Sequence, residues 1–157
     1  GLSQQGVWPR RRLEELLKGD APLAKRWTRV IELSDQMADD KAVPSGTRYD
    51  ALRILGAASY EAYGEHLAKY LESENDELQM GAISGLADVE SDAAGAAIAS
   101  QSARYNDENK RLAIAALLRT STRAVLLQGA LDKRQINPEA LTPEQNTQLK
   151  VFLDKTP

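Results

Sequence analysis

The chain has 157 residues, of which 20 are Lys or Arg, 23 are Asp or Glu, one is His and none is Cys. Its 42% hydrophobic and 27% charged residues are typical of a folded domain of ordinary size. The missing Cys excludes disulfides, cysteine-ligated zinc and covalent haem attachment in this segment, and the single His excludes a multi-histidine metal site, so we expect no cofactor. No apolar run approaches the ~20 residues of a transmembrane helix, and we expect no membrane insertion.

Helix signals follow one another along the chain, and no alternating Val/Ile/Thr-rich run predicts a strand. Pro9 can open a helix that ends at Gly19, and Pro22 can open a second. Polar residues suited to helix N-caps precede several of the later helices. Those helices are expected at 47–56, 59–72, 76–88, 91–104, 107–119, 121–134 and 143–154.

An internal repeat is the strongest pattern in the chain. Three predicted helices carry Ala, then an aliphatic residue, then Leu, at one constant 31-residue offset: Ala51/Ala82/Ala113, Leu52/Ile83/Ile114 and Leu55/Leu86/Leu117. Helix pairs that cannot bury their apolar faces alone must stack on one another. We therefore predict a single all-α domain, an α-α superhelix of about three helix pairs. Its parts are an N-terminal two-helix cap (1–43), three repeats (44–136) and a C-terminal capping helix (137–157). An ordinary helical bundle is the alternative.

The pattern of a polar or basic residue followed by Ala, an aliphatic residue and Leu resembles HEAT repeats of the short kind. That resemblance implies a solenoid and says almost nothing about function. Two helical glycines, Gly81 and Gly85, lie on one helix face and indicate close approach of a neighbouring helix. Trp8 and Trp27 are expected to pack on the core.

A second resemblance covers Lys110 to Leu153. It is similar to the helical-repeat region of large planctomycete-type proteins, the membrane-bound dehydrogenases with a haem-binding domain. The residues that carry it are Arg111-Leu112-Ala113, Leu117-Leu118, Leu126-Leu127, Ala130-Leu131, Ile136, Leu141 and Gln148-Leu149. The resemblance implies a bacterial, extracytoplasmic (periplasmic) and redox-associated parent, but no Cys-x-x-Cys-His is present to carry over a haem ligand. The chain opens with Gly1, as after cleavage of a tag, so we expect a domain excised from a longer protein.

One helix face could bind a partner. Tyr63, His66 and Tyr70 cluster on one side of the helix predicted at 59–72. Steps of the repeat length lead from them to small and polar residues that include Ala94, Ala97, Gln101 and Gln128. The prediction is a partner-binding ridge with a shallow groove, formed by Tyr63, His66, Tyr70, Gln101 and Gln128. The alternative is that the tyrosines pack between repeats with their hydroxyls in water. His66 has no second metal ligand in view.

The charge distribution bears on function. Residues 1–34 carry seven basic and four acidic side chains, residues 35–110 six and fifteen, and residues 111–157 seven and four. A centre this acidic opposes a phosphate-binding track, so we expect no nucleic-acid binding. We expect a non-catalytic protein-interaction or scaffold domain whose partner is another protein or another domain of the same chain. The alternatives are a HEAT-like enzyme or nucleic-acid module (DNA glycosylase-like or bilin lyase-like), or a basic cap (8–29) that docks on acidic partners or lipid head groups.

Overall fold

The computed structural model describes residues 7–154, and within that range every regular element is helical, as predicted for an all-α chain. The nine α-helices of this range are α1 (Pro9–Leu17), α2 (Ala21–Asp39), α3 (Ser45–Leu55), α4 (Tyr60–Tyr70), α5 (Asp76–Asp88), α6 (Asp92–Ser100), α7 (Asp107–Leu117), α8 (Ser121–Asp132) and α9 (Pro143–Asp154). Two 3-10 turns, Ser102–Arg104 and Pro138–Ala140, follow α6 and precede α9. No helix in the described range is long and apolar enough to span a bilayer.

Local capping explains where the helices begin. Asn75 accepts hydrogen bonds from the first amides of α5, and Asn106 does the same for α7, because a helix start leaves its amides without intrahelical acceptors. Thr120 caps α8 by accepting a hydrogen bond from the Arg123 amide through its side chain. The helix predicted at 91–104 is shorter than expected. The Tyr105 hydroxyl donates to the Ile98 carbonyl near the end of α6, 2.8 Å away, and the chain continues as a 3-10 turn.

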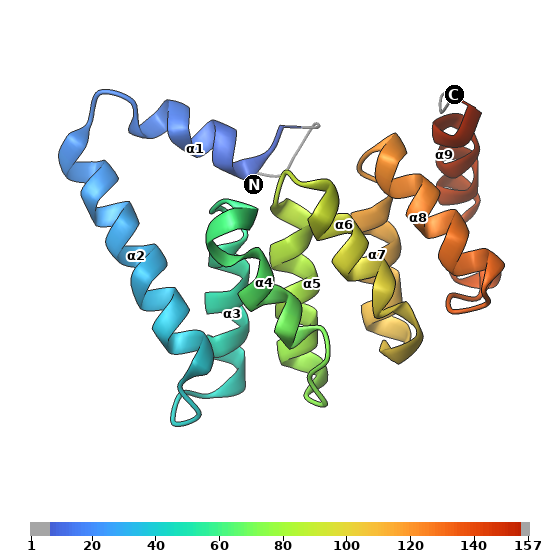
Figure 1. The fold of residues 1–157 in the computed structure, drawn as a ribbon, viewed down its shortest axis with the longest axis horizontal. Coiled ribbons are helices and arrows are strands. Elements are labelled where there is room, and N and C mark those ends of the chain that lie inside the picture. The colour runs from blue at the N-terminus through green and yellow to red at the C-terminus, as the bar shows by residue number, and fades with distance from the viewer. Residues whose placement is uncertain (1–6, 155–157) are drawn as a thin grey trace.

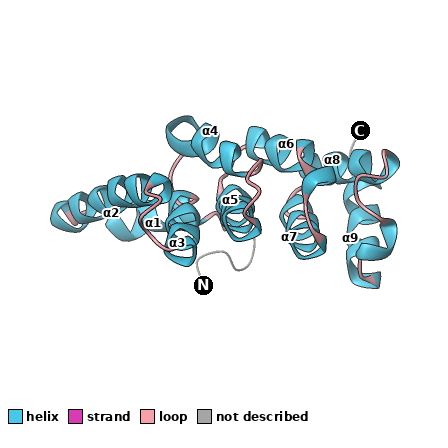
Figure 2. Cartoon of the chain, turned by 90° about the horizontal axis from the view of Figure 1, so that it is seen from below, coloured by secondary structure: helices cyan, strands magenta, loops and turns pink. Residues whose placement is uncertain are grey.

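The central helices form two layers. Helices α3, α5 and α7 pack side by side in one layer, and α4, α6 and α8 pack side by side in the other (Figures 1 and 2). At the two ends, α2 packs on α3 and α9 packs on α8. Successive helices therefore alternate between the layers, and helices related by the repeat offset are neighbours.

The residues of the repeat form the centre of the core. All nine are at most 2% exposed: Ala51, Ala82, Ala113, Leu52, Ile83, Ile114, Leu55, Leu86 and Leu117. The close approach predicted from the glycines is confirmed. A Cβ on Gly85 would lie 2.6 Å from the Leu52 carbonyl oxygen, and one on Gly81 would lie 3.0 Å from the Tyr49 carbonyl oxygen. Bare helix backbone is what lets α5 pack directly on α3.

Helix α1 packs less closely than the other helices. In α1 only Pro9 is buried, and Leu16 is 62% exposed. Gly19, at φ 86°, lies between α1 and α2, and α1 runs from there across the ends of the central helices (Figure 1). Trp27 packs against the core as expected. Trp8 instead lies over two arginine side chains, because α1 carries it away from α2 to the far helices.

Candidate functional site

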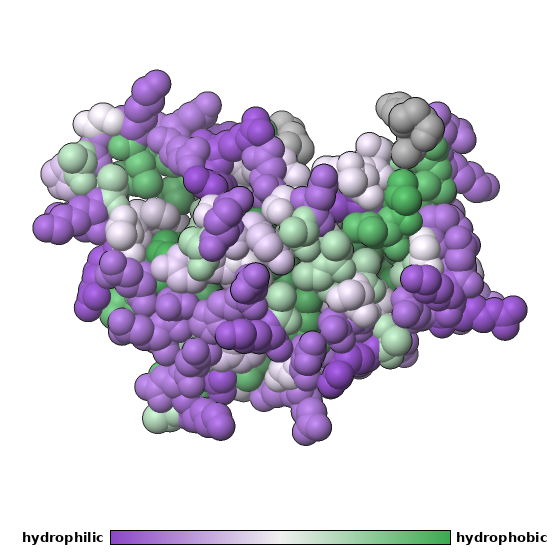
Figure 3. Space-filling view, viewed as in Figure 1, coloured by the Kyte–Doolittle hydropathy of each residue, from purple (hydrophilic) through white to green (hydrophobic). Residues whose placement is uncertain are grey.

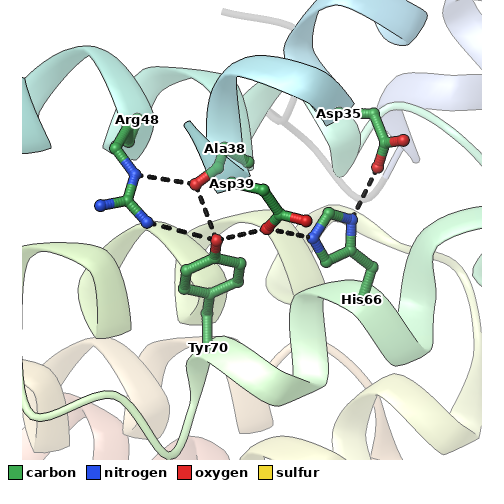
Figure 4. A network of polar contacts seen from close by, with 6 residues as sticks. All are labelled: Asp35, Ala38, Asp39, Arg48, His66 and Tyr70. Atoms are coloured by element: carbon green, nitrogen blue, oxygen red, sulfur yellow. Dashed lines mark hydrogen bonds and ion pairs between the residues drawn. The ribbon is translucent and has the colours of Figure 1, made fainter. Parts of the chain in front are cut away.

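A polar network joins α2 to α4 around the single histidine (Figure 4). His66, on α4, has its Nδ1 2.6 Å from Asp35 Oδ1 and its Nε2 2.8 Å from Asp39 Oδ1, both on α2. The His66 side chain is only 18% exposed. The two contacts hold the ring between the two acidic side chains of α2.

Tyr70 and Arg48 extend this network to the end of α2. The Tyr70 hydroxyl lies 2.7 Å from the Ala38 carbonyl and 2.5 Å from Asp39 Oδ1, and Arg48 Nη2 donates to it at 3.3 Å. Arg48 Nε donates to the same Ala38 carbonyl at 2.8 Å. The carbonyls of the last helical turn have no intrahelical partners. The two side chains thus complete the C-terminal end of α2.

Electrostatics favour an ionised Asp39. Burial acts to raise the pKa of Asp39, but hydrogen bonds from Tyr70 and His66, with the charges of His66 and Lys69, outweigh it and lower that pKa. Burial raises the pKa of Tyr70, and its bond to Asp39 raises it further. At neutral pH the network therefore holds an anionic Asp39 against a neutral Tyr70. Among the described residues, no group of three His, Cys, Asp or Glu side chains is placed to hold a metal ion.

A shallow hollow of about 290 Å³ lies between α4 and α6. Small residues line it together with a charged rim: Glu65, Ala68, Lys69, Leu71, Glu72, Ala97, Ser100 and Gln101. Gln101 donates to Glu72 Oε1 at 3.4 Å. Two of the residues expected to line a groove, Ala97 and Gln101, lie here, whereas Ala94 is fully buried.

The five residues of the predicted ridge lie in different settings. His66 and Tyr70 contact α2, and burial, followed by the negative charges on that helix, raises the pKa of Tyr63. Gln101 lies at the hollow between α4 and α6. Gln128 donates to Asp132 within α8, at 2.7 Å. The side of α4 that bears the aromatic residues is thus covered by α2, and partner binding by the five residues stays a prediction.

Sequence reasoning missed Asp35, Asp39 and Arg48, although a signal for the two acids was present. Asp35 and His66 are 31 residues apart, as are Asp39 and Tyr70. The repeat offset therefore extends upstream, and α2 carries the residues equivalent to those of α4. The apolar pattern begins only in α3, so it does not reveal this extension.

A second cluster joins α1 to the ends of the central helices. Arg123 is 1% exposed and donates to four backbone carbonyls, those of Ala87, Val89, Ser91 and Ala116. Burial, and then the charge of Arg119, lowers the pKa of Arg123 to about 10, so the guanidinium stays charged at neutral pH. The Trp8 ring lies 4.2 Å from the Arg119 guanidinium and 5.1 Å from that of Arg123. Arg11 also pairs with Glu90. These contacts fix the start of α1.

No family model matches the chain, and comparison with curated proteins and with solved structures finds no match either.

Proposed function

We propose that the chain is a HEAT-like α-α superhelix that binds another protein, or another domain of its own protein, without catalysing a reaction. Support comes from the repeat offset. Residues at equivalent positions are buried alike, and equivalent helices are neighbours in each layer. Stacked pairs of this kind form a stiff, extended surface, which is the usual binding element of helical-repeat proteins.

The hollow between α4 and α6 is the observation that carries the proposal. Its lining combines the apolar Ala68, Leu71 and Ala97 with charged and amide groups that include Lys69 and Glu72. A hollow of this shape accepts an apolar side chain of a partner and surrounds it with polar contacts, as the centre and rim of protein interfaces do. The polar groups of the His66 network, by contrast, are already used between α2 and α4.

The test is to fill the hollow. Ala97→Arg places a long side chain where a partner would insert, whereas Ala96→Arg changes the exposed neighbour on the same helix. The wild-type chain is used to isolate a partner from its source cells, and the affinity for that purified partner is then measured for both variants. We expect Ala97→Arg to weaken binding at least tenfold with an unchanged circular dichroism spectrum. Equal affinity of the two variants would contradict the proposed site.

A redox-associated, extracytoplasmic bacterial parent is a further part of this proposal, and the resemblance of residues 110–153 is its only support. Sequencing the source gene beyond both ends of the chain tests it. A downstream Cys-x-x-Cys-His and an upstream propeller-like region are the expected result. Their absence from the whole gene would overturn the assignment and leave the protein-binding proposal standing.

A further inference from the structure

Large apolar side chains are exposed on both N-terminal helices. Leu16 of α1 is 62% exposed, and on α2 Leu23 is 42%, Val30 38% and Leu33 40% exposed. In Figure 3 apolar side chains gather where α1 and α2 meet, next to a hydrophilic rim. Each exposed apolar side chain forgoes part of the favourable free energy of burial. A cluster of them is the usual mark of a surface that another molecule covers.

The spacing explains why α2 exposes these residues. Leu23, Arg26, Val30 and Leu33 follow one another at steps of three or four positions, so they form one stripe about 15 Å long on a helix. The buried residues of α2, Ile31, Ser34 and Ala38, lie on the adjacent flank of the helix. The helix is thus apolar over a wider arc than its packing uses. We define the α1–α2 face as Leu16, Leu23, Arg26, Val30 and Leu33.

The charges around this face are unbalanced. Residues 7–34 hold seven cations and four acids, and four of the cations form no ion pair: Arg12, Lys18, Lys25 and Arg26. Most acids of residues 7–34 are engaged, since Glu14 pairs with Arg10, Glu32 pairs with Arg29, and Asp20 caps α2. Glu15 is the one acid of that range without such a contact. The face therefore combines an apolar stripe with free positive charge, Arg26 lying within the stripe itself.

We propose that the α1–α2 face binds an acidic amphipathic helix of a partner protein. An apolar stripe with helical spacing is complementary to the stripe of a second helix, whose side chains enter between Leu23, Val30 and Leu33. Acidic residues that flank the partner's stripe meet Arg26 and the neighbouring cations, which sets partner choice and speeds association. The inference rests on the proposed protein-binding function and names the class of partner.

A helix fits this face better than a lipid surface does. A membrane-bound amphipathic helix immerses its whole apolar side, whereas the most buried residues of α2 already pack on the protein. What remains is a narrow stripe of three side chains with a guanidinium inside it. A stripe this narrow can contact one face of a single helix.

The test uses two synthetic peptides of about 18 residues, which is long enough to form a helix with one continuous apolar face. Both carry Leu at helical spacing, one flanked by Glu and the other by Lys. Fluorescence anisotropy of the labelled peptides gives affinities, and amide chemical-shift mapping on the folded 157-residue chain locates the binding surface. Because all substituted side chains are exposed, the variants Arg26→Glu and Leu33→Ser should keep the fold. The matched controls on other helices are Lys150→Glu and Val125→Ser, the latter at a residue that is 43% exposed.

We expect the Glu peptide to bind with shifts on α1 and α2, and both test variants to weaken binding at least tenfold while the controls change it less than twofold. Equal binding of the Lys peptide would overturn the proposal, as would binding of anionic vesicles (one part phosphatidylserine to three parts phosphatidylcholine) without binding of the Glu peptide. Absence of saturable binding by the Glu peptide would overturn it too. Shifts confined to the α4–α6 hollow would overturn this inference and leave the proposed function intact. If Ala97→Arg and Ala96→Arg bind the partner equally while the Glu peptide binds the α1–α2 face, only the assignment of the α4–α6 hollow as a binding site is overturned.

Discussion

The central helices and the N-terminal helices of this chain differ in how far they bury their apolar residues. In α3–α8 the apolar positions recur at the 31-residue offset, and bare glycine backbone lets neighbouring helices meet closely. In α1 and α2 apolar residues are also frequent, but many remain exposed. Helix α2 packs on α3 and carries the buried Ile31 and Ala38, and polar contacts with His66 and Tyr70 add to this packing. Helix α1 buries only Pro9 and is held mainly by Arg11 and Trp8.

This difference separates two tasks within one fold. Repeated apolar contacts give the centre its stability, because burial is the dominant favourable term in folding. Polar contacts orient α1 with little buried area, and several apolar side chains of both N-terminal helices stay exposed. Substitutions in each region test this division.

Core truncation should separate the two regions most strongly. Leu86→Ala removes a fully buried side chain and should lower the free energy of unfolding by about 3 kcal/mol. Leu16→Ala removes a side chain that is 62% exposed and should change it by less than about 0.5 kcal/mol. Urea titrations monitored by circular dichroism measure both. Similar losses for the two variants would contradict the division.

The buried Arg123 should matter almost as much as a core leucine. Arg123→Met fills a similar volume but removes the four hydrogen bonds that the guanidinium donates to backbone carbonyls, so we expect a loss of about 2–4 kcal/mol. The exposed Arg104 donates to one carbonyl only, and Arg104→Met should cost under about 1 kcal/mol. Chemical denaturation of both variants checks the difference. An unchanged free energy of unfolding in Arg123→Met would mean that water replaces the guanidinium's hydrogen bonds without loss of stability.

Two glycines of the central helices should respond in opposite directions to the same change. Gly85→Ala places a methyl group 2.6 Å from the Leu52 carbonyl oxygen, and we expect destabilisation of about 1–2 kcal/mol. Gly129→Ala meets no atom within 4 Å and should stabilise the chain by about 0.5–1 kcal/mol through helix propensity. Thermal and urea unfolding give the signs. Stabilisation by Gly85→Ala would refute the close contact of α3 and α5.

Removing Trp8 should release α1 without unfolding the centre. Trp8→Ala deletes the ring over Arg119 and Arg123, and we expect a global loss of about 1 kcal/mol or less. Amide hydrogen exchange should become much faster in α1 and stay unchanged in α5. Unchanged protection of α1 would show that Arg11 and Pro9 suffice to hold it.

The smallest effect concerns pH. Because the pKa of Asp39 is lowered in the folded state, its contribution to stability is complete above the unfolded value of about 4 and is lost as the pH falls below it. The Asp39 side chain is 65% exposed, so the contribution should stay under about 1 kcal/mol. Asp39→Asn should therefore lower stability at pH 7 and bring it close to wild type near pH 2. A constant difference between the two proteins across this range would exclude the linkage.

The helices and the core could be predicted from the sequence because their signals are local. Asn75 and Asn106 cap helices through their own side chains, and Ala82, Ile83 and Leu86 mark one face of a helix by spacing alone. The points where helices end were harder to predict. The end of α6 depends on a hydrogen bond from Tyr105 to Ile98, which a helical pattern cannot anticipate.

Periodic burial follows from helix geometry, so the all-α class, the 31-residue repeat and its nine central residues could be predicted from the sequence. Which polar groups meet could not be predicted in this way. The contacts of His66 with Asp35 and Asp39, and of Trp8 with Arg119 and Arg123, join helices that are distant in the chain. Such contacts depend on the angle at which whole helices pack. The exposure of Leu23, Val30 and Leu33 was settled in the same way, because α2 is apolar over a wider arc than α3 covers.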